Sequence, residues 1–231
     1  MNTNGHFNNA ISTFLKELNE FDEEKYDGIV GPDCTALSKS CYTIRTVWNC
    51  FKDDQKLHHW YLLYVLQPDL QRAVSHITSR AGYIDDAVAL VNLSYLPKEK
   101  FEVNKKMECV TKFPEQVENF VFYIRTARAV LREIQESLYK TKKTRMSHRI
   151  ELANLIRQTV LLWNSFTCKQ QQFYIELVML FTPFARSIAL DVKNTCPEHA
   201  DHADMLCIAI GELESCNGQK AVCGYKRQRT D

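Results

Sequence analysis

Apolar residues recur along this chain every three or four positions, and the clearest run lies within residues 114–194. In its first half the apolar positions are spaced so that one stripe stays on the same face of a helix. They are Val117, Phe120, Ile124, Ala127, Leu131, Ile134 and Leu138. After a short basic corner, a second apolar stripe runs from Leu152 to Phe166 and leads into the most apolar window of the chain. We therefore expect two long antiparallel helical arms, around which the other elements are organised.

Similar stripes predict further helices before and after these arms. The first helix is expected from about Asn4 to Glu24, and its acidic end opposes the helix dipole, which suggests fraying. Pro68 either kinks a helix or restarts one. Further helical segments are expected at 33–51, 59–66, 69–77, 83–96 and 197–215. The pattern predicts an all-α protein, a single bundle of six to eight helices centred on the two arms.

A charged stretch divides the pattern at residues 97–112, which carry five lysines and three glutamates after Pro97. We interpret this stretch as a solvated connection and as the best candidate for a sub-boundary. One body over residues 1–216 is still preferred, because a single bundle buries every stripe most economically. Residues 217–231 are expected to form a short, basic, disordered tail.

Composition narrows the class of protein. The sequence holds only 7 Gly and 6 Pro, which favours helices over folds with many tight turns. Its formal net charge of +1 is not the large positive excess that a dedicated nucleic-acid binder usually carries.

Nine cysteines include no C-x-x-C pair, and the chain begins with no secretory signal pattern. The expectation is an intracellular protein, cytoplasmic or nuclear, with reduced cysteines. No phosphate loop, nucleophile elbow or other catalytic motif is present, so we expect neither an enzyme nor a cofactor.

The apolar window Phe173–Leu190 has the length of a short membrane span. It contains Glu176, Pro183 and Arg186, and charges inside a membrane are costly. A buried bundle helix is therefore preferred, and no transmembrane segment is expected. A bundle that opens around this window to bind an apolar ligand or a membrane surface stays an alternative.

Two groups of residues have side chains that can bind a metal ion or transfer a proton. Cys196, His199, His202 and Cys207 form a C-x2-H-x2-H-x4-C pattern of zinc-type ligands, but structural zinc sites usually pair two separated couples of ligands. We expect instead a helix start with two exposed histidines and a buried cysteine, and a small zinc site at these residues stays an alternative. His58-His59 after two aspartates invites an acid–base interpretation, but adjacent histidines point in different directions on a helix, so at most one is expected to face a given cleft.

Two basic clusters, at residues 140–149 and 226–229, could contact phosphate or serve nuclear import, which makes a nucleic-acid or nuclear regulatory protein an alternative. Solvated surface is the simpler interpretation. The residues concerned are Lys140, Lys142, Lys143, Arg145, Arg149, Lys226, Arg227 and Arg229.

The leading hypothesis is a non-enzymatic adaptor or regulator that binds another protein through a hydrophobic groove or an aromatic face. Phe122 and Tyr123 lie off the main stripe of their helix, so either another helix covers them or a partner does. Association between copies of the chain is compatible with the same pattern. The candidate partner-binding residues are Trp48, Trp60, Tyr64, Phe122 and Tyr123.

Overall fold

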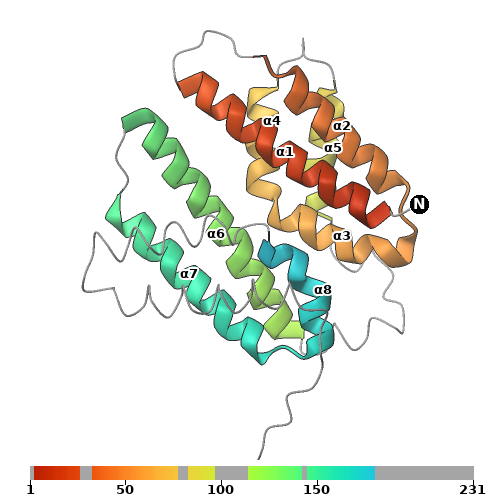
Figure 1. Cartoon of the computed structure of the whole chain (residues 1–231), viewed down its shortest axis with the longest axis vertical. Helices are drawn as coiled ribbons and strands as arrows, with labels where there is room; N and C mark the ends of the chain where they lie inside the picture. The colour runs from red at the N-terminus through yellow and green to blue at the C-terminus, as the bar shows by residue number, and fades with distance from the viewer. Residues whose placement is uncertain (1–2, 27–32, 78–82, 97–113, 142–144, 180–231) are drawn as a thin grey trace, which may run out of the picture.

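The computed structural model of the chain describes residues 3–26, 33–77, 83–96, 114–141 and 145–179 (Figure 1). Within these ranges the chain forms eight α-helices and no strand, which confirms the predicted all-α fold. In chain order the helices are α1 (Thr3–Tyr26), α2 (Thr35–Asn49), α3 (Asp53–Val65), α4 (Gln67–His76), α5 (Ile84–Ser94), α6 (Pro114–Thr141), α7 (Met146–Ser165) and α8 (Cys168–Met179).

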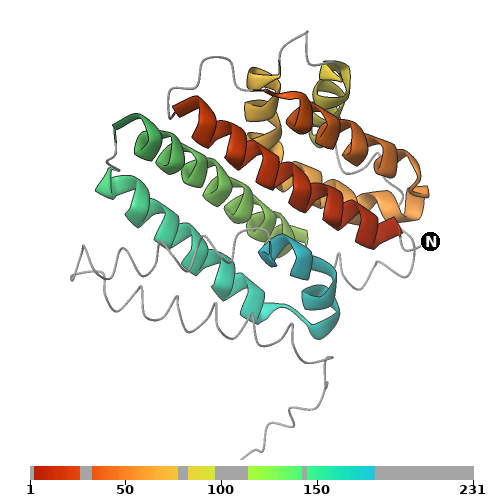
Figure 2. The ribbon, with the colours of Figure 1, turned by 45° about the horizontal axis from the view of Figure 1, so that its top comes forward.

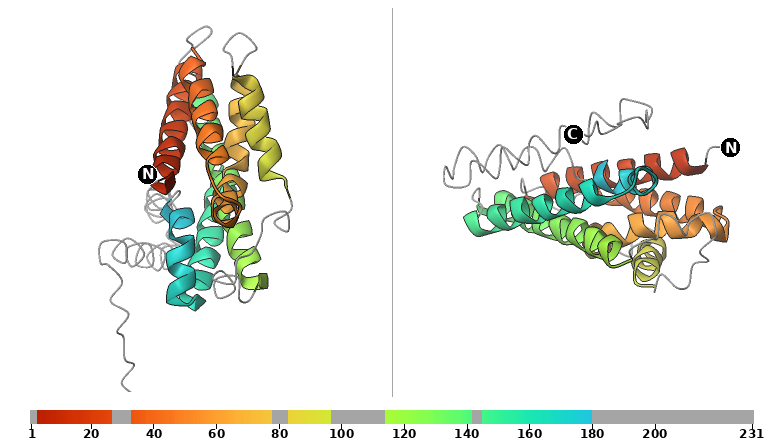
Figure 3. Two further views of the ribbon diagram at one scale, coloured as in Figure 1. Left: turned by 90° about the vertical axis from the view of Figure 1, so that its right-hand side faces the viewer. Right: turned by 90° about the horizontal axis from the view of Figure 1, so that it is seen from below.

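Helix α6 packs against five other helices in the described part. It packs against α7 as an antiparallel pair, and it also contacts α1, α3, α4 and α8. Figure 2 shows α1, α6 and α7 as three neighbouring rows. Helix α5 contacts α2, α3 and α4, and in Figure 3 it lies on the face of the bundle opposite α8. Helices from both sides of residues 97–112 therefore pack together, while that stretch and the tail at 217–231 lie outside the described residues.

The predicted stripes form the core. Every apolar position of the α1 stripe is buried, and so are the α6 positions from Val117 to Ile134. Removing such side chains from water is the main stabilising contribution to a bundle, because each buried large apolar residue contributes about 1.5–3 kcal/mol. The α1 stripe consists of Phe7, Ile11, Phe14, Leu18 and Phe21.

Two helix boundaries depend on capping. Pro68 lies in the first turn of α4, where its missing N–H costs nothing, so the chain restarts there rather than kinking. The second predicted arm is not continuous, because α7 ends at Ser165 and α8 begins at Cys168. Thr167 Oγ1 accepts a hydrogen bond from the Gln170 backbone N–H at 3.4 Å, and Gln170 Oε1 accepts one from the Thr167 N–H at 3.0 Å. This T-x-x-Q capping box, which the apolar spacing does not reveal, starts a new helix.

A buried charge network joins α1, α4 and α6. Asp69 on α4 is fully buried, and Arg128 donates two hydrogen bonds to it, from Nε at 2.7 Å and from Nη2 at 3.0 Å. Arg132 Nε donates to the same carboxylate. Burial alone would raise the pKa of Asp69, but the two guanidinium groups outweigh it and lower that pKa.

The second carboxylate of this network is Asp22 near the end of α1. It accepts two hydrogen bonds from Arg72 Nε, at 2.8 and 3.0 Å, and His76 Nε2 lies 2.9 Å away. Arg132 Nη1 lies 3.8 Å from Asp22, which links the two carboxylates. The acidic end predicted to fray is therefore anchored, since Asp22 lies buried among partners on two other helices.

Arg128 and Arg132 of α6 are buried within the core and do not lie at its edge. Arg128 is 2% exposed and Arg132 is 7% exposed, because buried carboxylates compensate their charges. Arg72 on α4 also contacts Glu136 on α6, with 3.3 Å between Nη1 and Oε2. Three arginines thus meet three carboxylates across three helices.

Removing one buried carboxylate tests how strongly this network holds the fold. Asp69→Asn would leave Arg128 and Arg132 without their shared countercharge, so we expect the free energy of unfolding to fall by about 3–5 kcal/mol. Urea unfolding followed by circular dichroism measures it. The control is Asp85→Asn at an exposed position of α5, where the loss should stay under about 1 kcal/mol. Equal losses in the two variants would contradict the structural role of Asp69.

Asp22 should make folding depend on pH in a defined direction. Burial raises the pKa of Asp22, but hydrogen bonds and charge from His76 and Arg72 outweigh this and hold that pKa below its ordinary value of 3.8. The stabilisation of the fold by ionised Asp22 is present above pH 3.8, and it is lost as the pH falls through the lower pKa that Asp22 has in the folded state. In urea unfolding, the stability difference between wild type and Asp22→Asn should shrink below that pH. A constant difference would rule out ionised Asp22 as its source.

Candidate functional site

A cavity of about 570 Å³ lies between α3, the start of α4, the end of α5 and the first half of α6. We call it the aromatic groove. Its volume falls within the range of about 300–1,000 Å³ that is typical of ligand pockets. Among the side chains that line it, the aromatic ones are Trp60, Tyr61, Tyr64, Tyr95 and Phe122.

The aromatic side chains come from both walls of the groove. On α3, Trp60 and Tyr64 are one helical turn apart, and their ring centroids are 5.2 Å from each other. On α6, Phe122 points away from the apolar stripe and is 51% exposed. Tyr95, at the end of α5, is 59% exposed, and its hydroxyl accepts a hydrogen bond from Gln71 Nε2 at 2.7 Å. Apolar rings thus extend from inside the groove onto the surrounding surface.

The groove is also lined by polar side chains, and two of them, Gln67 and Arg125, contact each other. The polar side chains are Gln67, Ser94, Glu118, Asn119 and Arg125. The Arg125 guanidinium lies 4.8 Å from the centre of the Tyr64 ring, and its Nη2 donates a hydrogen bond to Gln67 Oε1. Gln67 is completely buried, yet its Nε2 has no hydrogen-bond partner among the described protein atoms, and neither has Arg125 Nε. A buried donor without a partner costs about 1–3 kcal/mol. An oxygen atom of a bound molecule would remove that cost.

The structure brings together three of the five aromatic residues predicted to bind a partner, since Trp60, Tyr64 and Phe122 line the groove. Tyr123 is half-buried beside Phe122, with 5.9 Å between their rings. Trp48 does not join this group. It is 4% exposed and packs in the core near Phe7, because it belongs to the buried stripe of α2.

Other groove residues do not stand out in the sequence. Arg125 follows Phe122 by three positions, which places the two on one face of α6. Helical spacing could therefore have predicted that Arg125 belongs to the groove. Gln67 and Tyr95 carry no such signal, because they come from different helices and meet only in the folded chain.

Three of the predicted basic residues lie within the part of the chain that the structure describes. Lys140 forms an ion pair with Glu136, Arg145 is exposed just before α7, and Arg149 is half-buried within α7. Surface pairs of this kind contribute little to stability. The other members of the predicted clusters lie outside the described residues, namely Lys142, Lys143, Lys226, Arg227 and Arg229.

The zinc pattern at residues 196–207 also lies outside the described residues, with Cys196, His199, His202 and Cys207. So does Pro183, within the most apolar window of the sequence. Among the described helices, none combines the length and the apolar character needed to cross a membrane.

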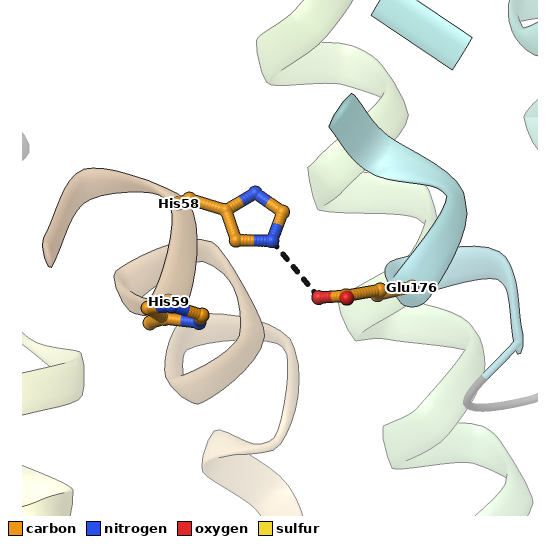
Figure 4. A group of neighbouring side chains, drawn as sticks. All are labelled: His58, His59 and Glu176. Carbon is orange, nitrogen blue, oxygen red and sulfur yellow. Dashed lines mark hydrogen bonds and ion pairs between the residues drawn. The ribbon is translucent and has the colours of Figure 1, made fainter. Parts of the chain in front are cut away.

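The adjacent histidines of α3 contact different residues, His58 contacting Glu176 and His59 contacting Asn4, although both lie near the same carboxylate. Ligand atoms of His58, His59 and Glu176 all lie within 4.8 Å of one another (Figure 4). His58 Nε2 is 2.9 Å from Glu176 Oε2, and this partner keeps the pKa of Glu176 low although burial opposes it. Burial and the neighbouring His58 lower the pKa of His59 to about 3.

No family model, curated protein or solved structure matches this chain. The aromatic groove offers apolar contact area together with hydrogen-bond donors, which suits binding of a molecule that has an apolar part beside an oxygen acceptor.

Proposed function

We propose that this chain is a non-enzymatic interaction protein whose aromatic groove binds a short segment of another protein, one with an apolar anchor side chain beside a carboxylate. The observation that carries the proposal is the combination of exposed Phe122 with the buried, unpartnered Gln67 amide in one cavity. Burial of aromatic anchors in pockets supplies most of the affinity at protein interfaces.

The donors at Gln67 and Arg125 support an acidic anchor region in the partner, placed away from Glu118, which also lines the groove. Gln67 Nε2 and Arg125 Nε can only donate hydrogen bonds, and Arg125 adds a positive charge beside the Tyr64 ring. A carboxylate accepts from such donors and balances that charge, and charge-assisted hydrogen bonds are stronger than neutral ones.

The extent of the apolar surface supports a macromolecular partner over a small molecule. Phe122 and Tyr95 remain more than half exposed, so a molecule confined to the cavity would leave much of both rings in water. A peptide anchored in the groove can also cover the rim, and excluding water around an anchor strengthens its contacts.

Selection from a randomised peptide library tests this proposal, because the peptides that bind reveal which chemistry the groove prefers. Peptides enriched on the wild-type chain should carry a large apolar residue close to Asp or Glu. A synthetic enriched peptide should bind Phe122→Ala about tenfold more weakly by fluorescence anisotropy, because roughly 1.4 kcal/mol of apolar contact is lost.

The matched control is Leu161→Ala, since Leu161 on α7 is 52% exposed, almost the same as Phe122, but does not line the groove. Its affinity for the peptide should equal that of wild type. The proposal would be overturned if the enriched peptides bound Phe122→Ala as tightly as they bind wild type. A self-association that depends on Phe122 would also overturn it, by making a second copy of this chain the occupant.

The role of Arg125 can be isolated by a double-substitution cycle. Replacing the acidic residue of the enriched peptide by its amide should weaken binding to wild type about tenfold, and the same replacement should have little effect on Arg125→Met. Isothermal titration calorimetry of the four combinations gives the coupling energy. Equal losses in the two proteins would show that Arg125 does not contact the carboxylate.

A further inference from the structure

A separate group of polar side chains lies where α3 meets α8 and the start of α1. It contains His58, His59 and Glu176, with Asn4 and Asn8 beside them, and shares no residue with the aromatic groove. Figure 4 shows His58 directed toward Glu176 and the His59 ring lying below it. Two imidazoles and one carboxylate are the ligand set of many open zinc sites.

His59 has a ring nitrogen whose partner is missing. Its Nε2 lies 3.3 Å from Asn4 Oδ1, an atom that only accepts hydrogen bonds, so Nε2 carries the proton and Nδ1 carries the lone pair. His59 is 1% exposed, and Nδ1 has no hydrogen-bond partner among the described atoms. Phe51 stacks on the ring with centroids 3.8 Å apart, which restricts its rotation. Burial keeps this imidazole neutral, the form that binds metals.

Glu176 is held in place from a third helix. Asn8 on α1 donates a hydrogen bond to Glu176 Oε1 at 2.7 Å, while Oε2 contacts His58. A hydrogen bond to one oxygen of a carboxylate orients the other oxygen, and such outer contacts are typical around metal ligands.

We propose that His58, His59 and Glu176 form a binding site for a divalent transition-metal ion of the zinc class, with one ring nitrogen from each histidine and an oxygen of Glu176 as ligands.

The spacing of these atoms is close to what such an ion requires. Zinc bonds of about 2.1 Å place neighbouring ligand atoms of a tetrahedral site roughly 3.4 Å apart. The present atoms lie within 4.8 Å, so side-chain shifts of about 1 Å would close the site. The ion would replace the direct contact between His58 and Glu176 and would neutralise the charge of the carboxylate.

A small cavity adjoins Glu176, one of the three proposed ligands. The cavity has a volume of about 180 Å³ and is lined by Asn8, Ser12, Leu62 and Glu176, among others. It is lined by neither histidine, but it gives room for a water molecule beside the carboxylate.

Titration of the metal-free full chain with Co²⁺, followed by competition with Zn²⁺, tests this site. One equivalent of Co²⁺ should give the visible absorption of a four-coordinate ion, and one equivalent of Zn²⁺ should abolish it. His58→Gln and Glu176→Gln, both at half-buried positions, should each weaken binding at least tenfold. His59→Gln should do the same, with circular dichroism confirming that each variant is folded.

Two control variants separate this site from other histidines and cysteines. His148→Gln changes a half-buried histidine on α7, and Cys196→Ser changes a residue of the C-x2-H-x2-H-x4-C pattern, so neither should alter Co²⁺ affinity. The proposal is overturned if the chain binds no Co²⁺ at one equivalent, or if binding survives the three site substitutions. It is equally overturned if the bound Co²⁺ shows thiolate charge-transfer absorption, which would assign the ligands to cysteines.

Discussion

A network of three arginines and three carboxylates, of which Arg128, Arg132, Asp22 and Asp69 are buried, fixes how α1, α4 and α6 meet. An ion pair between buried groups tolerates little displacement, because each lost contact leaves a charge in a medium that solvates it poorly. Apolar stripes alone allow neighbouring helices to slide by a turn with modest loss, since leucine and isoleucine contacts are not directional. The two hydrogen bonds from Arg128 to Asp69 do not allow that shift. We infer that the network sets the register of the bundle, while apolar burial supplies most of its stability.

The geometry of the aromatic groove depends on this register. Gln67 precedes Asp69 by two residues on α4, and Arg125 precedes Arg128 by one helical turn on α6. Pairing Asp69 with Arg128 therefore brings Gln67 and Arg125 together a short distance along the same interface, where they form their hydrogen bond. The guanidinium then lies beside the Tyr64 ring of α3. A change that breaks the buried network would consequently alter a surface groove that contains none of the network residues.

Helical stripes could be predicted from the sequence because their signal is local. The α1 stripe from Phe7 to Phe21 and the α6 stripe from Val117 to Ile134 require only the period of the helix. The partners of polar residues could not be predicted in this way. Asp69 and Arg128 are 59 positions apart, and no local rule links them. The same holds for Glu176, which lies 118 positions from His58. Thr167 and Gln170 are different, because a capping box is a local signal that an apolar pattern conceals.

In the described part of this chain, some buried polar atoms have protein partners and others have none. The first kind stabilises the fold, whereas the second kind indicates where a ligand binds. The carboxylate oxygens of Asp22 and Asp69 accept hydrogen bonds or ion pairs from arginines on other helices, so these groups are explained by folding itself. Gln67 Nε2 and His59 Nδ1 belong to fully buried side chains and have no protein partner among the described atoms. His148 Nδ1 and Arg157 Nε on α7 and Arg125 Nε in the groove are also buried atoms without a partner among the described atoms, but their side chains are only half-buried. Folding alone does not favour burying a polar atom without a partner. Gln67 lines a groove with exposed aromatic rings, and His59 faces a second histidine and a glutamate, so in each place the neighbouring groups indicate the chemistry of the missing partner: a carboxylate in the first, a metal ion in the second.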